Sequence, residues 1–140
     1  MIGDELAQSD ILAKLKTITS VTSLLGDGTS GIKEIQWQGD SFTYPNVRLD
    51  LETNEYVFDE QERCQLQYVE FSVYIFSQER SSKQCSQIKS LLANALIGAG
   101  FTGTNARYIR IRLVDNIPAV REDRLTWRSH IKLSTQLHPL

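Results

Sequence analysis

The amino-acid sequence predicts an α+β fold, a two-layer sandwich in which two helices pack on one face of a mainly antiparallel sheet. Two segments place apolar residues at helical spacing, and five others alternate apolar and polar residues with the two-residue period of a strand. The order along the chain is helix, three strands, helix, two strands. The apolar stripes of the helices and the apolar strand faces must cover each other, and this predicts the two layers.

The first helix is predicted over residues 4–18, where apolar side chains recur at helical spacing and Asp4 and Glu5 lie in the first turn. The elements expected next are a turn at 20–25, a glycine-rich loop at 26–31, a strand at 32–38, a loop at 39–45 and a half-buried strand at 47–51. Residues 52–62, ETNEYVFDEQE, hold five acidic residues around Tyr56, Val57 and Phe58 and are interpreted as an excursion or hairpin loop.

The strongest strand pattern is QLQYVEFSVYIFS, residues 65–77, which we expect at the centre of the sheet. A second helix follows, with Ser81 or Ser82 as a cap and an end at Gly98. Its expected apolar stripe consists of Cys85, Ile88, Leu91, Leu92, Ala95 and Leu96.

Two basic strands are predicted at 106–114 and 124–133, joined by the link DNIPAVRED, 115–123. Alternation assigns Ile109, Ile111, Leu113, Leu125, Trp127, Ile131 and Leu133 to the face toward the helices. It assigns Tyr108, Arg110, Arg112, Arg124, Thr126, Arg128, His130 and Lys132 to the opposite, cationic face. A half-buried sheet shows polar side chains to water in any case, so an ordinary solvent face and a contact face are both open interpretations.

Length and composition suit one soluble domain spanning residues 1–140, with 41% hydrophobic and 23% charged residues. The acidic start MIGDELAQSD lacks the pattern of a signal peptide, and no apolar run is long enough to span a membrane, so we expect synthesis in the cytoplasm. Cys64 and Cys85 lie far apart without zinc-ligand or redox spacing and are expected to be free thiols.

Charge is distributed unevenly along the chain. Residues 1–70 hold thirteen acidic and five basic side chains, whereas residues 71–140 hold four acidic and ten basic ones. If these charges also separate in space, they favour head-to-tail contact between copies or docking on a charged partner. If they mix in space, the asymmetry has no such consequence.

No catalytic motif supports an enzyme. The chain has no glycine-rich phosphate loop, no GxSxG and no HExxH, and GAGFTG at 98–103 follows a helix instead of a strand. His130 and His138 are the only histidines, and His130 lies in a basic stripe without an identified nucleophile. We therefore expect no catalytic residues, no cofactor and no metal site.

Element order and length resemble the tail terminator, or tail completion, proteins of long-tailed bacteriophages, including the lambda-type terminator. The stretches that carry the resemblance are DILAKLKTITSVTSLLG, YVEFSVYIFSQERSSKQCSQIKSLLANAL and the two final strands. The resemblance implies a structural virion protein of the tail or neck. Such a protein forms a hexameric ring that caps the tail tube, stops its polymerisation and presents a joining surface to the head-side connector.

With this resemblance, we predict that Arg110, Arg112, Arg124, Arg128 and Lys132 lie at a subunit contact or face the channel. The predicted partner-contact loop consists of Glu52, Glu55, Tyr56, Phe58, Asp59, Glu60 and Glu62. Tyr56, Val57 and Phe58 are candidate anchors, with packing onto their own domain as the alternative.

The expected partners are further copies of the chain, the tail tube protein, the head-tail connector and DNA that passes the channel without sequence-specific binding; no membrane is expected. A head-side connector or stopper is the alternative within the virion. A nucleic-acid-binding module is a further alternative, which the sequence pI of about 5.7 disfavours.

Overall fold

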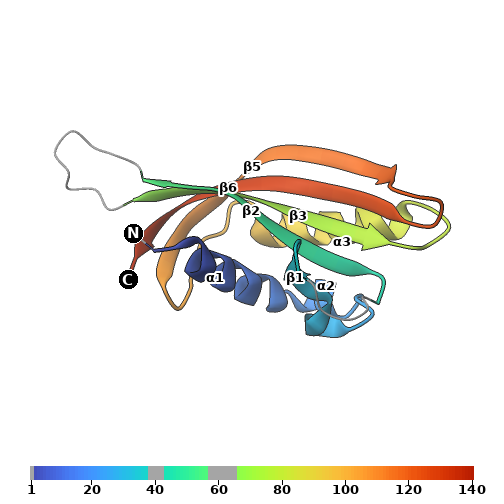
Figure 1. The fold of residues 1–140 in the computed structure, drawn as a ribbon, viewed down its shortest axis with the longest axis horizontal. Helices are drawn as coiled ribbons and strands as arrows, with labels where there is room; N and C mark the ends of the chain where they lie inside the picture. Colours follow the sequence, from blue (N-terminus) through green and yellow to red (C-terminus); the bar gives the residue numbers. More distant parts are fainter. Residues whose placement is uncertain (1, 38–42, 57–65) are drawn as a thin grey trace.

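The computed structural model describes residues 2–37, 43–56 and 66–140 (Figure 1). In chain order, its elements are α1 (Asp4–Lys16), α2 (Thr19–Thr22), the 3₁₀ helix η1 (Gly28–Gly31), β1 (Ile32–Glu34), β2 (Asn46–Tyr56), β3 (Gln67–Ser77), α3 (Lys83–Leu96), β4 (Phe101–Thr102), β5 (Ala106–Arg121) and β6 (Trp127–Pro139). The predicted α+β class is confirmed.

The strands form one six-stranded sheet in the order β1-β2-β3-β6-β5-β4. The short β1 runs parallel to β2, and every other neighbouring pair is antiparallel. The helices α1 and α3 lie on the same face of the sheet (Figure 1). The strand predicted at 65–77 occupies an inner position as β3, which was expected from its continuous apolar face.

The core lies between the helices and one face of the sheet. From β3 it takes the alternating residues Val69, Phe71, Val73 and Ile75, all fully buried or nearly so. The α3 stripe of Cys85, Ile88, Leu92 and Leu96 is also buried, as its helical spacing predicted. The opposite sheet face therefore has no helix on it, and its side chains are available for other contacts.

Asp10 connects the first helix to the other end of the chain. Its buried carboxylate accepts hydrogen bonds from the backbone N–H groups of Thr104 and Asn105, from the Asn105 side chain and from the Tyr108 hydroxyl. These donors compensate for the cost of burying a charge. Burial, and then the neighbouring Asp10 carboxylate, raise the pKa of Tyr108, so its hydroxyl remains a donor.

Three predicted segments differ from the structure. The link expected at 115–123 is mostly strand, because β5 continues to Arg121 and pairs with β6 along most of its length. The strand expected at 32–38 is only three residues long, and the excursion expected from residue 52 begins as part of β2. Residues 38–42 and 57–65 lie outside the described part of the chain.

The predicted facing of the basic strands was wrong at Tyr108, Ile109 and Leu125. Tyr108 is buried on the helix-covered face, whereas Ile109 is exposed on the other face. The cause is the register shift between Ile109 and Arg112, since the added residue interrupts the two-residue alternation. Leu113 pairs with the buried Leu133 and therefore lies on the helix-covered side as predicted, but it is exposed there. Leu125 is 67% exposed because it lies in the turn before β6.

Candidate interaction face

The helix-free face of the sheet carries most of the side chains that the sequence singled out. Residues paired across neighbouring strands share a face and form rows that cross from β2 through β3 and β6 to β5. Three of these rows, each given from β2 to β5, are Glu55-Tyr68-Gln136-Ile109, Thr53-Glu70-Ser134-Arg112 and Asp50-Ser72-Lys132-Asp115. In these rows the β2 ends include Glu55 and Asp50, and the β5 ends include Arg112 and Asp115.

An ion-pair network occupies the centre of this face. The Lys132 ammonium lies 3.0 Å from a Glu52 carboxylate oxygen and 3.3 Å from one of Glu70. Hydrogen bonds to Glu52 and then Glu70 raise the pKa of Lys132. The Ser72 hydroxyl donates to Glu52, which is a further bond within the network. Lys132 is therefore engaged within its own chain instead of being free for a neighbour.

Tyr68 holds the Glu70 carboxylate in its charged form. Its hydroxyl donates a 2.6 Å hydrogen bond to Glu70, and this bond is the main cause that lowers the pKa of Glu70. The same hydrogen bond raises the pKa of Tyr68. On β2, burial and then the neighbouring Glu52 raise the pKa of Asp50.

His130 packs against Tyr74 in the next row, with ring centroids 4.5 Å apart. Burial, and then the nearby Arg128 charge, lower the pKa of His130, which favours the neutral ring. Its Nδ1 atom is buried and has no hydrogen-bond partner among the described residues. His130 therefore behaves as a packed aromatic side chain and adds no charge to the face at neutral pH.

Arg128 and Arg124 lie where the turn joins β5 to β6. The Arg128 guanidinium forms a 3.5 Å ion pair with Glu122, and both side chains are 39% exposed. Arg124 lies in the turn between β5 and β6, where its carbonyl oxygen accepts a hydrogen bond from Arg121. An exposed ion pair contributes only about 0 to 1 kcal/mol, so Arg128 gains little stability from Glu122.

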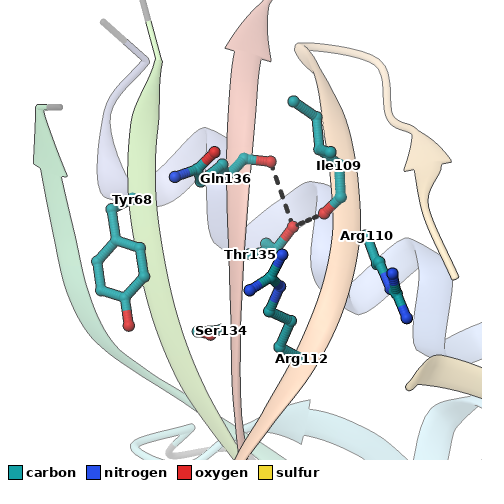
Figure 2. Close-up of a pocket in the computed structure, with 7 residues that line it drawn as sticks. All are labelled: Tyr68, Ile109, Arg110, Arg112, Ser134, Thr135 and Gln136. Atoms are coloured by element: carbon teal, nitrogen blue, oxygen red, sulfur yellow. Dashed lines mark hydrogen bonds between the residues drawn. The ribbon is translucent and has the colours of Figure 1, made fainter. Parts of the chain in front are cut away.

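Arg110 and Arg112 flank a groove on the helix-free face (Figure 2). The groove has a volume of about 340 Å³, and its lining is Tyr68, Ile109, Arg110, Arg112, Ser134, Thr135 and Gln136. The register shift between Ile109 and Arg112 produces this arrangement, because the added residue separates the two strands locally. At the shift, the Thr135 hydroxyl donates to the Ile109 carbonyl oxygen.

The two arginines extend to opposite sides of β5. Figure 2 shows Arg112 reaching over Thr135 toward β6, whereas Arg110 extends away from β6. Arg110 also lines two further hollows beside β5, one with Ile97 and Leu113 and one with Phe101. Neither guanidinium has an ion-pair partner within the described residues.

Exposed apolar side chains lie near the Arg110 and Arg112 guanidinium groups. Leu113 is 47% and Val114 46% exposed, and Ile97 and Ile109 are exposed nearby. Arginine beside exposed apolar groups is typical of protein contact surfaces. This cluster was not predicted from the sequence, because alternation placed Leu113 among the core residues and assigned Val114 to neither face.

Only part of the predicted partner-contact loop lies in the described residues. Glu55 and Tyr56 are exposed at the end of β2, and Glu52 belongs to the Lys132 network. Phe58, Asp59, Glu60 and Glu62 lie outside the described residues, as does Cys64. Glu55 has no ion-pair partner in the described part of the chain.

The described residues show neither a metal cluster nor a membrane-spanning helix. Within the described ranges, no three His, Cys, Asp or Glu side chains gather in a way that could hold a metal ion. No described helix combines the length and the apolar character needed to cross a membrane. Cys85 is a free, buried thiol that contacts the Ser129 hydroxyl at 3.1 Å, and burial raises its pKa.

Comparison with known proteins supports the fold. No protein-family model matches the chain, and no curated protein matches it. A similar solved structure is a chain from the virion of a native gene transfer agent particle, with a TM-score of 0.71 and 11% sequence identity. The match covers 96% of this chain and 98% of that chain. At this identity the similarity establishes a shared fold over nearly the whole length of both chains.

Proposed function

We propose that this chain is a structural virion protein, a tail terminator whose copies form a ring, expected to be hexameric, on the end of a tail tube. The ring stops polymerisation of the tube and provides the surface that joins the head-side connector. The observation that carries this proposal is the end-to-end fold similarity to a chain of a gene transfer agent virion. The match covers 96% of this chain and 98% of that chain, which supports a single domain over residues 1–140 as the assembling unit.

The surface chemistry supports an assembly role over an enzymatic one. The helix-free face combines ion pairs, arginines without an ion-pair partner among the described residues, and exposed apolar side chains, and the sequence contains no glycine-rich phosphate loop, GxSxG or HExxH. Exposed charges contribute little affinity but select the partner and the register of a contact. In a ring each feature repeats around the axis, so five basic residues become a charged annulus.

The five predicted basic residues now separate into two groups. Among the described residues, Arg110, Arg112 and Arg124 have no ion-pair partner, whereas Lys132 and Arg128 are engaged with Glu52, Glu70 and Glu122. We assign the first group to contacts between proteins. DNA that passes through the ring would meet a face of mixed charge, which suits passage without tight or sequence-specific binding.

Addition of the purified protein to growing tail tubes tests this function. A terminator arrests the tubes, so electron microscopy should show a uniform length and a ring at one end. Unchanged tube growth together with binding to isolated head connectors would instead favour a head-side stopper. Tight binding of the monomer to DNA at low salt, measured by filter binding, would favour a nucleic-acid-binding module.

A further inference from the structure

We infer that copies of this chain join side by side, with the outer edge of β1 in one copy against residues 112–121 of β5 in the next copy. This inference rests on the proposed ring and names the contact that would close it. Its basis is that the two stretches are uncovered, lie at the same level of the sheet and carry matching side chains.

β1 forms one margin of the six-stranded sheet, and β5 forms most of the other margin (Figure 1). On β5, β4 pairs with residues 107–108, and residues 98 and 99 bond to Ile111, so this cover ends before residue 112. Within the described residues, no further strand pairs with the outer edge of β1 or with β5 at 112–121. Both stretches are therefore open to another molecule.

The two open stretches lie at the same level along the strands. One row of paired residues crosses the sheet through the strands β1, β2, β3, β6 and β5, and it consists of Lys33, Arg48, Tyr74, His130 and Ile117. The next row begins at Glu34 and ends at Asn116. A neighbouring copy placed beside the sheet, without a shift along the strands, therefore brings its β1 against the middle of the open stretch of β5.

Strand direction suits the same placement. β1 is parallel to β2, and three antiparallel pairings separate β2 from β5, so β1 and β5 run in opposite directions. The contact thus continues the antiparallel alternation of the sheet. A rotation between copies about an axis parallel to the strands keeps the facing residues level. Repeated head-to-tail contacts of this kind close into a ring when the rotation permits it.

Exposed apolar side chains lie at both edges. Ile35 and Trp37 follow β1 and are exposed, and Leu113, Val114 and Val120 are exposed on the open stretch of β5. Apolar side chains gathered on uncovered surface are typical of contacts between proteins. Their mutual burial would supply the affinity that exposed charges alone do not give.

One pair of charges favours this contact over its alternatives. Lys33 and Asp115 both lie on the helix-free face, and Asp115 is one row from the level of Lys33. Neither has an ion-pair partner among the described residues. Diagonal neighbours on adjacent strands are within reach of long side chains, so Lys33 of one copy can pair with Asp115 of the next. Two β1 edges would bring lysines together, and two β5 edges would bring aspartates together.

Side chains, more than backbone hydrogen bonds, would form this contact. β1 is only three residues long, and Pro118 on β5 has no N–H to donate. The carbonyl oxygen of Ile117 already accepts a hydrogen bond from the Lys89 ammonium. Short edges, proline and lysine at an edge limit the open-ended addition of strands. Two such edges therefore associate through their matched side chains.

Disulfide trapping tests the contact in the full-length protein. Lys33→Cys and Ile117→Cys, combined in one Cys64→Ser chain, place thiols at the same level on the two edges. Mild oxidation should link copies into a ladder of multimers on a non-reducing gel, and the ladder should end at the number of copies in the ring. The matched control carries Arg107→Cys in place of Ile117→Cys, at the level that β4 covers, and should give no ladder.

Charge exchange and loss of apolar area give a second measurement. Lys33→Asp should raise the protein concentration for half-maximal ring formation about tenfold, Asp115→Lys should act in the same direction, and both in one chain should restore assembly. Leu113→Ser with Val114→Ser should also weaken assembly. Leu6→Ser, at an exposed apolar position on α1, is the control and should leave it unchanged. Sedimentation measures ring formation, and far-UV circular dichroism verifies that every variant folds.

The outcomes separate this inference from the proposed function. Wild-type rings that cap tubes, together with no ladder from the Lys33→Cys, Ile117→Cys chain, would overturn the inference and leave the terminator role intact. A ladder from a protein that does not stop tube growth would support the contact and overturn the terminator role. A wild-type protein that never oligomerises would overturn both. Assembly lost by the single exchanges and not regained by the double exchange would count against the Lys33 contact with Asp115.

Discussion

The Asp10 carboxylate on α1 accepts a 3.0 Å hydrogen bond from the hydroxyl of Tyr108 on β5, across 98 positions of sequence. Both side chains are buried, and Asp10 receives three further hydrogen bonds from the turn before β5. This cluster holds the first helix against the part of the chain that leads into the basic strand. It therefore supports the position of β5 from the helix-covered side of the sheet.

Tyr108→Phe should lower the free energy of unfolding by about 1 to 3 kcal/mol, because it removes one hydrogen bond to a buried carboxylate. Asp10→Ala should cost more, since it leaves several buried donors without their acceptor. Urea denaturation followed by circular dichroism measures both. Equal stability of wild type and Tyr108→Phe would contradict the role given to this hydrogen bond.

Gly103→Ala should lower the free energy of unfolding by about 1 to 3 kcal/mol. An added Cβ would lie 2.5 Å from Cγ of Asp10, whose hydrogen bonds prevent it from moving aside. The control is Gly31→Ala, where the nearest atom, of Leu25, would be 3.4 Å away. Thermal melts of the two variants should differ, and similar melting temperatures would argue against a close approach at residue 103.

Tyr68→Phe should raise the pKa of Glu70 toward its ordinary value, because the Tyr68 hydroxyl is the main cause of the lowered pKa. A carboxyl group with a lowered pKa in the folded state stabilises the fold above its unfolded pKa. This stabilisation is lost as the pH falls through the folded value. NMR titration of the Glu70 carboxyl carbon measures the shift, and an unchanged pKa in the variant would contradict the assignment.

Acidification should destabilise the protein through His130. Its pKa is lowered in the folded state, so its contribution to stability is present above the unfolded pKa of about 6.5 and is lost as the pH falls through the folded value. His130→Phe keeps an aromatic ring beside Tyr74 but cannot be protonated. Melting temperatures between pH 7 and pH 5 should therefore fall further for the wild type than for the variant, and parallel curves would refute this prediction.

The general fold could be predicted because it depends on local periodicity. The alternation of Val69, Phe71, Val73 and Ile75 and the stripe of Cys85, Ile88, Leu92 and Leu96 each identify a buried face within one segment. Any structure that covers both faces must stack helix on strand, so the two layers follow from these patterns. The inner position of β3 followed in the same way from its long apolar face.

The candidate contact surface could be predicted only in part. The basic character of the two final strands is visible in sequence, but their pairing is not, and the three register shifts decide which side chains face outward. The shift between Ile109 and Arg112 places Tyr108 on the covered face and Ile109 on the open face, and the groove lies beside this shift. A bulge depends on how one strand is paired with another, and no periodicity within a single strand reveals it.

By itself, the sequence determined the fold class, the two helical stripes, the central strand and the uneven distribution of charge, because these properties depend on the order of residues along one segment. Only the tertiary structure decided that Lys132 is already paired with Glu52 and Glu70, whereas Arg110 and Arg112 have no ion-pair partner among the described residues. It also decided which side chains of β2, β3, β6 and β5 share a row on the helix-free face. Both results depend on strand order and register, which bring distant segments together.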